Sequence, residues 1–496
     1  MKKFLLFVAI FAMVLGCTKE VKPGIVVDPE TENPDDSGKK PDSGDKDDPD
    51  DPDDSGDSGD QGDGGYTAEE GLAYIFSGKD VPEFHVSVSL SEWNRLLSEY
   101  DRNSNTAESI HADVRYVGNG DEISISDIGL RLRGNTSRRR PEGSGGQSHA
   151  GDGADWHHCH YQLNFTKYNK DTEHELHGVK KLYLKWFKDD PAYVREVYCF
   201  DLFHRAGIWT APYNGYCRLW MKVEGDSKET YLGVYGMNET IDGRYANARA
   251  DKFGEKNGFL WKCVYGASLS STDDGLFGED GSDRTYELKT QNEDYQLAKA
   301  QLQDFIKKVA GKGDESFRTW ITQVCDVDLL LRTYAVNVAV GMWDDYWKNR
   351  NNFYIYFNSK DTYEYQFFFI PYDYDNTLGT SSLGMDAGRQ DPLNWGDNGN
   401  PLIYKLLRHE EFRKIYKEAL LSLVDPSTGE FYYQTSMKRI RGWYDQIRDY
   451  VSNDTGEDMS IEDKPASFGN HSEYRLLDEN NNFFKVRAET INKYCK

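Results

Sequence analysis

The 496-residue sequence predicts an α+β protein with a strand-rich first part and a helical last part. Between residues 83 and 240, short runs such as IHADVRYVG alternate apolar and polar residues, the period of half-buried strands. From residue 295 onward, runs such as YQLAKAQLQDFIKKVAG repeat apolar residues at helical spacing. Strands that precede helices, rather than alternate with them, are typical of the α+β class.

The first elements are a strand and then a helix in PEFHVSVSLSEWNRLLSEY, for which Ser91 is the expected N-cap. Further strands are expected in IHADVRYVG, ISISDIGLRLRG, YQLNFTKY and KKLYLKWF. The spacing becomes helical in DPAYVREVYCFDLFHRAGI, which predicts a helix that ends at Gly207. GYCRLWMKVEG and TYLGVYGMNETI predict a β-hairpin.

The second half is predicted to start with helices in YQLAKAQLQDFIKKVAG and DVDLLLRTYAVNVAVGM. A hairpin follows, with strands FYIYF and QFFFIPY around the turn NSKD. The last helices are expected in NPLIYKLLRHEEFRKIYKEALLSLV, MKRIRGWYDQIRDYV and FFKVRAETINKYCK. Because no linker-like segment interrupts residues 66–496, we expect one large unit with lobes.

The first seventeen residues, MKKFLLFVAIFAMVLGC, have the basic start and short apolar run of a secretory signal. The ending VLGC resembles a bacterial lipobox, in which Cys17 is lipidated and becomes the first residue of the mature chain. An ordinary signal peptide is the alternative. We therefore expect an exported protein of the cell envelope, held at the outer membrane or cell surface by lipid alone.

Residues 18–65 are predicted to be a disordered acidic tether, because they contain almost no apolar side chains. From residue 28 to residue 63 there are 16 acids and 3 lysines, so about half of the net charge of −25 lies in the tether. The acidic balance argues against nucleic acid as a partner. Removing Cys17 leaves six widely spaced cysteines without a C-x-x-C pair, which excludes a zinc ribbon and leaves the disulfide pairing of an exported chain open.

Two acidic clusters bracket the aromatic hairpin in WDDYWKNRNNFYIYFNSKDTYEYQFFFIPYDYDNTLG. Asp344 stands five residues before Asn349, the spacing of a kinase catalytic loop, and Asp373 and Asp375 follow the second strand. In phosphoryl transfer one aspartate accepts the proton of the attacking hydroxyl, while an asparagine and a second aspartate hold a divalent metal. The alternative is a solvated hairpin with acidic ends.

Other clusters are weaker. RLRGNTSRRR combines a strand end with arginines and would suit an anion, although a basic loop explains it equally well. WHHCHY, residues 156–161, lacks a further zinc ligand at the usual spacing. The acids of residues 273–283 do not follow the EF-hand pattern and predict a surface loop.

RLRGNTSR, VREVYCFDLFHRAGI, YLGVYGMNETID and above all NNFYIYF…FFFIPYDYDNTLG resemble the CotH kinase family over about residues 80–425. This resemblance implies a diverged, two-lobed protein-kinase-like fold that uses ATP with Mg²⁺ or Mn²⁺ to phosphorylate protein serine or threonine. In the family's pattern Asp344 corresponds to the catalytic aspartate, and Asn349 or Asn352 to the metal-binding asparagine. Asp373 and Asp375 correspond to the acidic metal ligands, and we expect Asp373 to be the direct one.

The chain departs from the family's pattern at Gln162, where a lysine for the nucleotide phosphates is expected. Glu239 in MNETID corresponds to a family glutamate at a strand end and is expected to help bind the cofactor. The cationic residues that could replace the missing lysine are Lys185, Lys262, Arg131 and Arg133.

Two main function classes remain open. One is a metal-dependent kinase with a protein or surface-glycan substrate. The other is a catalytically weak surface module that binds a protein or a glycan, for which the 14% aromatic content provides stacking surfaces. Glycoside hydrolysis by a carboxylate pair is a third possibility, based only on the neighbouring acids.

Overall fold

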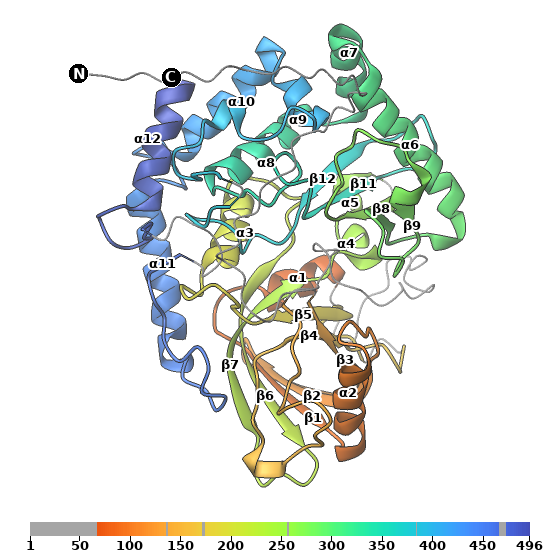
Figure 1. The fold of residues 1–496 in the computed structure, drawn as a ribbon, viewed down its shortest axis with the longest axis vertical. Helices are drawn as coiled ribbons and strands as arrows, with labels where there is room; N and C mark the ends of the chain where they lie inside the picture. Colours follow the sequence, from red (N-terminus) through yellow and green to blue (C-terminus); the bar gives the residue numbers. More distant parts are fainter. Residues whose placement is uncertain (1–66, 135–136, 171–173, 255–256, 383, 466–472) are drawn as a thin grey trace, which may run out of the picture. The chain divides into compact units, whose positions relative to one another are not determined.

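The computed structural model describes residues 67–496 except 135–136, 171–173, 255–256, 383 and 466–472. Cys17 and the acidic tether therefore lie outside the described residues, which all belong to one compact unit, residues 41–496. None of the described helices combines the length and apolar character needed to span a bilayer. The mixed α+β class is confirmed: strands dominate the first part and helices the last (Figure 1).

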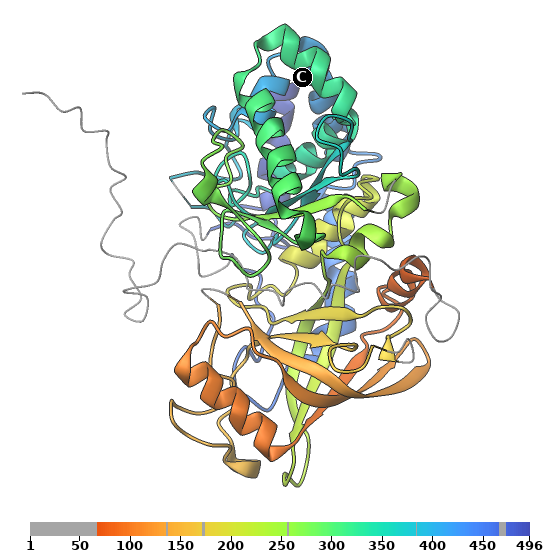
Figure 2. The same ribbon diagram turned by 90° about the vertical axis from the view of Figure 1, so that its right-hand side faces the viewer.

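Seven strands of the first part form a closed barrel in the order β1-β2-β3-β4-β5-β7-β6 (Figures 1 and 2). All neighbours are antiparallel except β1 and β6, whose parallel pairing closes the barrel. Its strands are β1 (Glu83–Val88), β2 (Ile110–Gly118), β3 (Asp121–Arg133), β4 (His160–Asn164), β5 (Lys181–Lys185), β6 (Asn214–Val223) and β7 (Thr230–Glu239).

Alternation within these strands separates an apolar interior from a polar exterior. Leu130 and Leu132 of β3, Leu163 of β4 and Leu184 of β5 belong to the barrel core, together with Trp93 of α2 (Leu90–Arg102). A short helix, α1 (Ala68–Ile75), begins with a capping box and adds Leu72 and Ile75 to the same core. The residues between these leucines face outward and include arginines, which positions them for the site described below.

A second sheet has the order β12-β11-β8-β10-β9. Its strands are β8 (Phe259–Cys263), β9 (Phe277–Gly278), β10 (Tyr286–Leu288), β11 (Phe353–Phe357) and β12 (Phe367–Pro371). Every residue of β8, β11 and β12 is buried, as expected for apolar runs covered on both faces. The predicted hairpin is confirmed by the antiparallel pairing of β11 with β12.

The helices of the last part surround this sheet and share its core (Figure 1). The longer ones are α6 (Tyr295–Gly311), α7 (Asp314–Val324), α8 (Val327–Ala339), α10 (Glu410–Leu423), α11 (Tyr433–Ile447) and α12 (Phe483–Cys495). Three short helices are α4 (Gly243–Asn247), α5 (Ala250–Phe253) and α9 (Pro401–Leu406). The end of α11 packs against the barrel, because Ile447 shares a small core with Tyr216 of β6 and Val234 of β7.

Three sequence expectations need correction. The N-cap of α2 is Ser89, whose hydroxyl accepts from the N–H of Glu92 at 3.2 Å, and not Ser91. The helical run from residue 400 to 424 is two helices, because α9 ends at Leu406 and α10 restarts at Glu410. The surface loop predicted at residues 273–283 contributes strand β9 to the second sheet.

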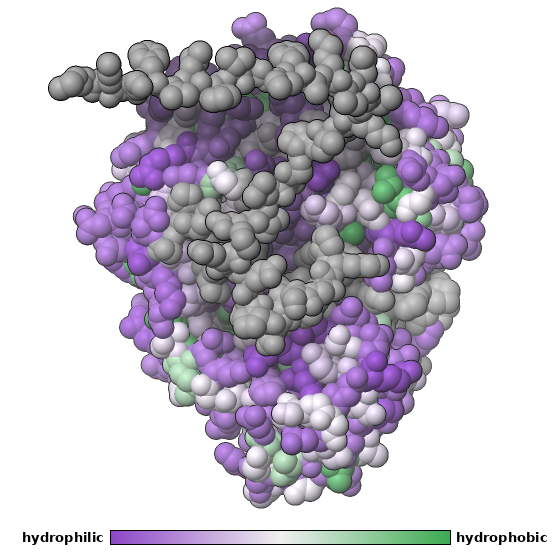
Figure 3. All heavy atoms as spheres, in the orientation of Figure 1, coloured by the Kyte–Doolittle hydropathy of each residue, from purple (hydrophilic) through white to green (hydrophobic). Residues whose placement is uncertain are grey.

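The surface of the described residues is mostly hydrophilic on the face in Figure 3. The high aromatic content lies inside, since Tyr265, Tyr363 and Tyr450 are the only aromatic side chains among the large apolar residues that the described part exposes. The six described cysteines are buried and unpaired with one another.

Candidate functional site

A lysine at a strand end and a glutamate at a helix start form the centre of the candidate site. Lys185 is the last residue of β5, and Glu196 is the second residue of α3 (Arg195–Arg205). The Nζ of Lys185 lies 3.3 Å from Oε1 of Glu196. Asn238 of β7 donates to Oε2 of Glu196 at 3.2 Å, and Asn214 of β6 donates to Oδ1 of Asn238 at 2.8 Å. These bonds hold the glutamate against the outer wall of the barrel.

The start of α3 is fixed by a buried ion pair. Asp190 accepts from the N–H groups of Val194 and Arg195 at 3.0 and 2.9 Å, and its carboxylate pairs with the Arg195 guanidinium. Arg195 also donates from Nε to the carbonyl oxygen of Thr377 at 3.1 Å. The helix that carries Glu196 is therefore tied to the segment that follows β12.

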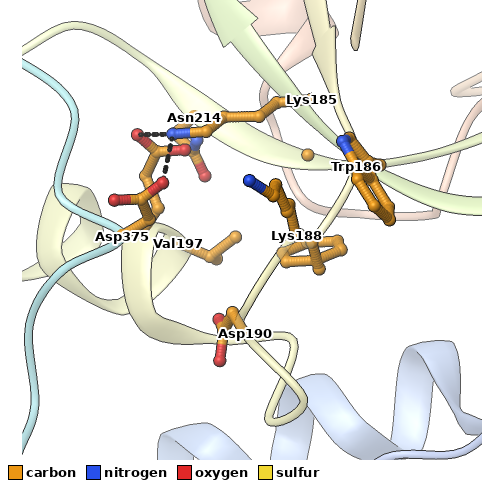
Figure 4. A pocket seen from close by; sticks show the side chains of 10 residues that line it. Lys185, Trp186, Lys188, Asp190, Val197, Asn214 and Asp375 are labelled. Atoms are coloured by element: carbon orange, nitrogen blue, oxygen red, sulfur yellow. Dashed lines mark hydrogen bonds and ion pairs between the residues drawn. The ribbon is translucent and has the colours of Figure 1, made fainter. Parts of the chain in front are cut away.

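That segment brings Asp373 and Asp375 to the same lysine. The Nζ of Lys185 contacts Oδ1 of Asp373 and lies 3.1 Å from Oδ2 of Asp375; Figure 4 shows the lysine reaching toward Asp375. Asp373 has a φ of 58°, in the left-handed region that a non-glycine residue adopts at a cost of about 1–3 kcal/mol. The turn directs both acids back toward the barrel as soon as β12 ends.

One ammonium group therefore serves three carboxylates. Burial lowers the pKa of Lys185, but the charges of Asp373, Asp375 and Glu196 outweigh burial and raise that pKa well above its ordinary value. Burial raises the pKa of Glu196 and of Asp375, while the Lys185 ammonium lowers both. The charge of Asp344 also raises the pKa of Asp375, so the two acidic clusters lie within electrostatic reach. A further cation would be favourable here.

The second cluster is built around Asp344, between α8 and β11. Three asparagine side chains donate from Nδ2 to its carboxylate: Asn349 at 2.6 Å, Asn352 at 3.0 Å and Asn351 at 3.2 and 3.3 Å. Arg350 and Asn352 have φ values of 58° and 54°, which turn the chain sharply enough to bring the amides together. The carboxylate is thereby held in one orientation.

Asp345 links this loop to the first cluster. It accepts from Nδ2 of Asn337 on α8 at 2.7 Å and from the N–H of Lys348 at 2.8 Å, and burial raises its pKa to about 7. The Oδ1 of Asn337 accepts from the Tyr374 hydroxyl at 2.7 Å. The N–H of Tyr374 donates to Oε1 of Glu196 at 3.3 Å. Asp345, Asn337, Tyr374 and Glu196 thus form one chain of hydrogen bonds between the two clusters.

The outer face of the barrel supplies cationic side chains beside the acids. Arg131 donates from Nη2 to Oε1 of Gln162, its register partner on β4, at 2.7 Å. The Arg133 guanidinium lies 3.2 Å from the centre of the Tyr183 ring and donates to the Tyr372 hydroxyl at 3.4 Å. Because Tyr372 directly precedes Asp373, Arg133 reaches the acidic segment.

Lys262 and Glu239 differ in their positions. Lys262 lies on β8 beside Tyr354 of β11, with its Nζ 5.8 Å from the centre of the Tyr372 ring, so it is near the same segment. Glu239 ends β7 and forms two hydrogen bonds with Arg249, at 2.7 and 2.8 Å. It sits opposite Leu182, at the end of β5 that is away from Lys185, and stabilises the structure there.

The other basic and histidine-rich motifs are used internally. Arg139 forms two hydrogen bonds with Glu457, at 3.0 and 2.9 Å, and Arg140 pairs with Asp101 at 2.9 Å. His158 is hydrogen-bonded to the carbonyl oxygen of Leu232 at 2.8 Å. These contacts explain the two motifs structurally and leave the acidic clusters as the main chemical feature.

The sequence matches the family described as CotH kinase protein over residues 130–491. The chain belongs to the CotH kinase family. The match contains the barrel strands from β3 onward, both acidic clusters and nearly all of α12, so it extends beyond the expected end at residue 425. The chain is also 26% identical over 292 residues to the inner spore coat protein H of Bacillus subtilis (strain 168), covering 58% of this chain and 72% of that protein.

The candidate site has a small pocket beside Lys185, between the barrel and α3 (Figure 4). Asp375 and Asn214 line it, and the Oδ1 atom of each is buried without a hydrogen-bond partner among the described residues. Trp186 lines it as well, and its indole nitrogen is likewise buried without a described partner. Buried polar atoms are normally satisfied, so water or another polar species in the pocket would complete their hydrogen bonds.

The donor set fits a hard divalent cation. The described residues contain no group of three or more His, Cys, Asp or Glu side chains arranged to hold a metal. Mg²⁺, however, is bound by one or two carboxylates together with phosphates and water, rather than by an all-protein cage. Oδ1 of Asp375 is a carboxylate oxygen without a hydrogen-bond partner among the described residues. The side-chain nitrogens of Asn349 and Asn352 donate to Asp344, so their side-chain oxygens are the atoms that could bind a metal. The expectation that Asp373 is the direct ligand stays a prediction, and Asp375 is the acid whose Oδ1 has no hydrogen-bond partner in the described part of the chain.

Sequence reasoning missed Glu196, Asn337 and Asn351. A glutamate at the start of the helix after the KLYLK strand was a usable signal for Glu196, because helix starts and strand ends often meet at a sheet edge. Nothing in the sequence indicates Asn337, which lies within the apolar helix α8 and contacts both clusters only in three dimensions.

Proposed function

We propose that this chain is a kinase that transfers the terminal phosphoryl group of ATP to serine or threonine side chains of proteins, with Mg²⁺ or Mn²⁺. The observation that carries the proposal is the Lys185 ammonium shared by Glu196, Asp373 and Asp375, within electrostatic reach of Asp344. A strand lysine paired with a helix glutamate, a metal-binding aspartate and a catalytic-loop aspartate are the recurring parts of protein kinases. Membership of the CotH kinase family supports this assignment.

The fold is consistent with a diverged two-lobed kinase. In this proposal the barrel and α3 act as the nucleotide lobe, and the second sheet with its helices acts as the lobe that carries the acids. Lys185, with Arg133 on the adjoining face, would neutralise the nucleotide phosphates. Arg131 and Lys262 lie farther from the acids and would add positive electrostatic potential around the site. Gln162 is compatible with this role, since it positions Arg131 in place of a lysine.

Asp344 would accept the proton of the attacking hydroxyl. Its three asparagine donors keep the carboxylate in place, which is the preorganisation that a general base needs. A bound divalent cation supplies neutralisation of the phosphate charge. Asp375 and the oxygens of Asn349 and Asn352 would hold it, and Glu196 would keep Lys185 oriented toward the phosphates.

The proposed setting is the cell envelope. Lipidation at Cys17 and the tether of residues 18–65 would place the folded part outside the cytoplasm, with the membrane contacted through the lipid alone. The substrate would be a protein of the envelope, and the net charge of −25 makes nucleic acid an unsuitable partner.

Calorimetry with Mn²⁺-ATP tests the proposal on the full chain and single variants. Asp375→Asn should weaken binding by about 1–3 kcal/mol, because a charged contact to the metal is lost. Asp344→Asn should leave the affinity within about twofold and lower phosphoryl transfer by roughly 10²–10⁴-fold, the contribution of a general base. Lys185→Met should weaken binding of ATP more than that of AMP, because the lysine is assigned to the phosphates.

Asp274→Asn is the matched control, since Asp274 is an exposed acid on a surface turn, with 80% of its side chain accessible. It should behave like the wild type. Absence of metal-dependent nucleotide binding by the wild-type chain, or equal binding by all variants, would reject the kinase site. In that case the chain is a catalytically inactive surface module that uses the same fold for binding.

A further inference from the structure

The tip of the β11–β12 hairpin borders a surface groove of about 580 Å³, which no part of the kinase proposal uses. The groove runs between the hairpin turn, α6 and α7, and its lining includes Lys308, Trp320, Tyr363 and Tyr365. The pocket beside Lys185 is far smaller. The groove therefore has room for an extended ligand.

Tyr363 makes the groove unusual for a soluble protein surface. Its accessibility of 71% is the highest among the large apolar side chains that the described residues expose. The Nζ of Lys308 lies 5.2 Å from the centre of the Tyr363 ring and 6.0 Å from that of Trp320, so the ammonium group sits between two aromatic rings. An aromatic ring held in solvent beside a concave surface is a platform on which an apolar ligand face can stack.

The turn that carries Tyr363 is held in place. Gln301 on α6 donates from Nε2 to the carbonyl oxygens of Ser359 and Asp361, at 2.8 and 2.6 Å. The Asp361 carboxylate accepts from the N–H groups of Tyr363 and Glu364, at 2.7 and 2.9 Å. These hydrogen bonds hold the turn in a conformation that exposes Tyr363. Because the turn is already ordered, a ligand that binds there would lose little additional conformational entropy of the loop.

Tyr365 lines the groove beside the turn, and its side chain is 5% exposed. Its hydroxyl is buried, and burial together with the charge of nearby Asp304 on α6 raises the pKa of this phenol. Tyr365 therefore contributes ring surface to the groove, whereas its hydroxyl is closed to a ligand.

We propose that this groove binds a neutral oligosaccharide. Sugar rings offer one apolar face for stacking on Tyr363 and hydroxyl groups for the polar turn. The lining has two carboxylates, Asp361 and Glu364, against one lysine, which disfavours polyanions such as nucleic acids. The same polar side chains disfavour an apolar helix or a lipid.

The groove lies about one strand length from the acidic clusters. Asn352 and the turn are at opposite ends of the five-residue strand β11, a separation of roughly 17 Å at 3.3 Å per residue. An oligosaccharide bound at the turn therefore leaves the acidic clusters open. The site functions whether or not the chain transfers phosphate.

Binding of chitohexaose, maltohexaose and xylohexaose to the full chain, measured by calorimetry, tests the proposal. Tyr363→Ala should reduce the affinity by about tenfold or more through loss of stacking. Tyr265→Ala is the matched control, because Tyr265 is an exposed tyrosine outside the groove, and it should bind like the wild type. A heparin-derived hexasaccharide should bind no more tightly than the neutral sugars.

Tyr363→Phe is the conservative variant at the exposed position. Because it keeps the aromatic ring, it should bind the sugars within about twofold of the wild type. Two results would overturn the proposal. One is that none of the three neutral sugars binds at millimolar concentration; the other is that Tyr363→Ala binds them as tightly as the wild type does.

Discussion

At the scale of single residues, Asp344 and Asp345 show how adjacent carboxylates acquire different chemistry. Asp344 is surrounded by three asparagine amides and has the oriented carboxylate that the proposed general base needs. Asp345 receives one amide and one backbone N–H in a nearly dry site, so burial raises its pKa to about 7. Two consecutive residues therefore differ in role: Asp344 is a candidate catalytic group, and Asp345 is a structural one.

The shifted pKa of Asp345 predicts a pH dependence of stability. An unfolded aspartate titrates near pH 3.9, whereas the folded group keeps its proton up to about pH 7. Between these values the folded state binds more protons, so the free energy of unfolding falls as the pH rises and reaches a lower plateau above pH 7. From pH 5 to pH 8, wild type should lose roughly 2–4 kcal/mol relative to Asp345→Asn, which does not titrate.

Chemical denaturation of both proteins at several pH values measures this difference directly. Titrations elsewhere in the molecule are common to both chains and cancel in the comparison. Parallel stability curves for the two proteins between pH 5 and pH 8 would show that Asp345 is ionised throughout.

At the scale of elements, helix α3 depends on Asp190. This carboxylate accepts from two N–H groups at the start of the helix and pairs with Arg195, and both side chains are almost fully buried. Asp190→Ala would leave the arginine charge buried without its partner, which should lower the free energy of unfolding by about 3–5 kcal/mol. Because Glu196 follows directly, we also expect weaker binding of Mn²⁺-ATP.

Arg205→Ala provides the comparison on the same helix. Arg205 pairs with Asp201 at 2.8 Å and its side chain is 44% exposed, so its loss should cost only about 0–1 kcal/mol. Thermal unfolding and calorimetry distinguish the two variants. Equal effects of Asp190→Ala and Arg205→Ala would contradict the role of Asp190 in positioning α3.

The loop after the Asp373–Asp375 segment depends on a close contact between Gly379 and Tyr474. Gly379 has a φ of 99°, and a Cβ atom there would lie 2.7 Å from Cβ of Tyr474. Gly384 has a φ of 71° with no atom near its missing Cβ. Gly384→Ala should therefore cost only the backbone strain, about 1–2 kcal/mol, while Gly379→Ala adds an overpacking cost of about 1–3 kcal/mol.

Thermal denaturation of the two glycine variants tests this difference. Equal losses would mean that Tyr474 shifts without cost and does not fix the loop. A larger loss for Gly379→Ala would establish that the C-terminal segment holds the loop that follows the acids.

The elements themselves could largely be predicted from periodicity, because each strand and helix carries its own pattern of burial. Closure of the barrel could not be predicted, because the parallel pairing of β1 with β6 joins residues as far apart in the sequence as Glu83 and Arg218. The acidic clusters could be found because they flank the hairpin strands. Asn337 could not, since its role depends on contacts between elements that the local sequence does not encode.

At the scale of the whole molecule, the barrel and the helical part are joined by long-range contacts. The end of α11 packs on β6 and β7, and Arg139 next to β3 forms two hydrogen bonds with Glu457 beyond α11. The proposed site lies where these parts meet, with the lysine from the barrel and the acids from the hairpin. Binding and stability should therefore respond together to changes at this boundary.

The last prediction concerns the segment before the described residues. If Cys17 carries the lipid, Cys17→Ser should move the protein from the membrane fraction to the aqueous phase on detergent phase separation, because a single changed atom removes the acylation site. Deletion of residues 24–64 should leave the melting temperature nearly unchanged, since so acidic and apolar-poor a segment cannot contribute a packed core. The two variants are independent: the first should change location without changing stability, and the second should change neither. Unaltered membrane association of Cys17→Ser would reject the lipid anchor, and a marked loss of stability on deletion would show that the acidic segment packs against the folded part.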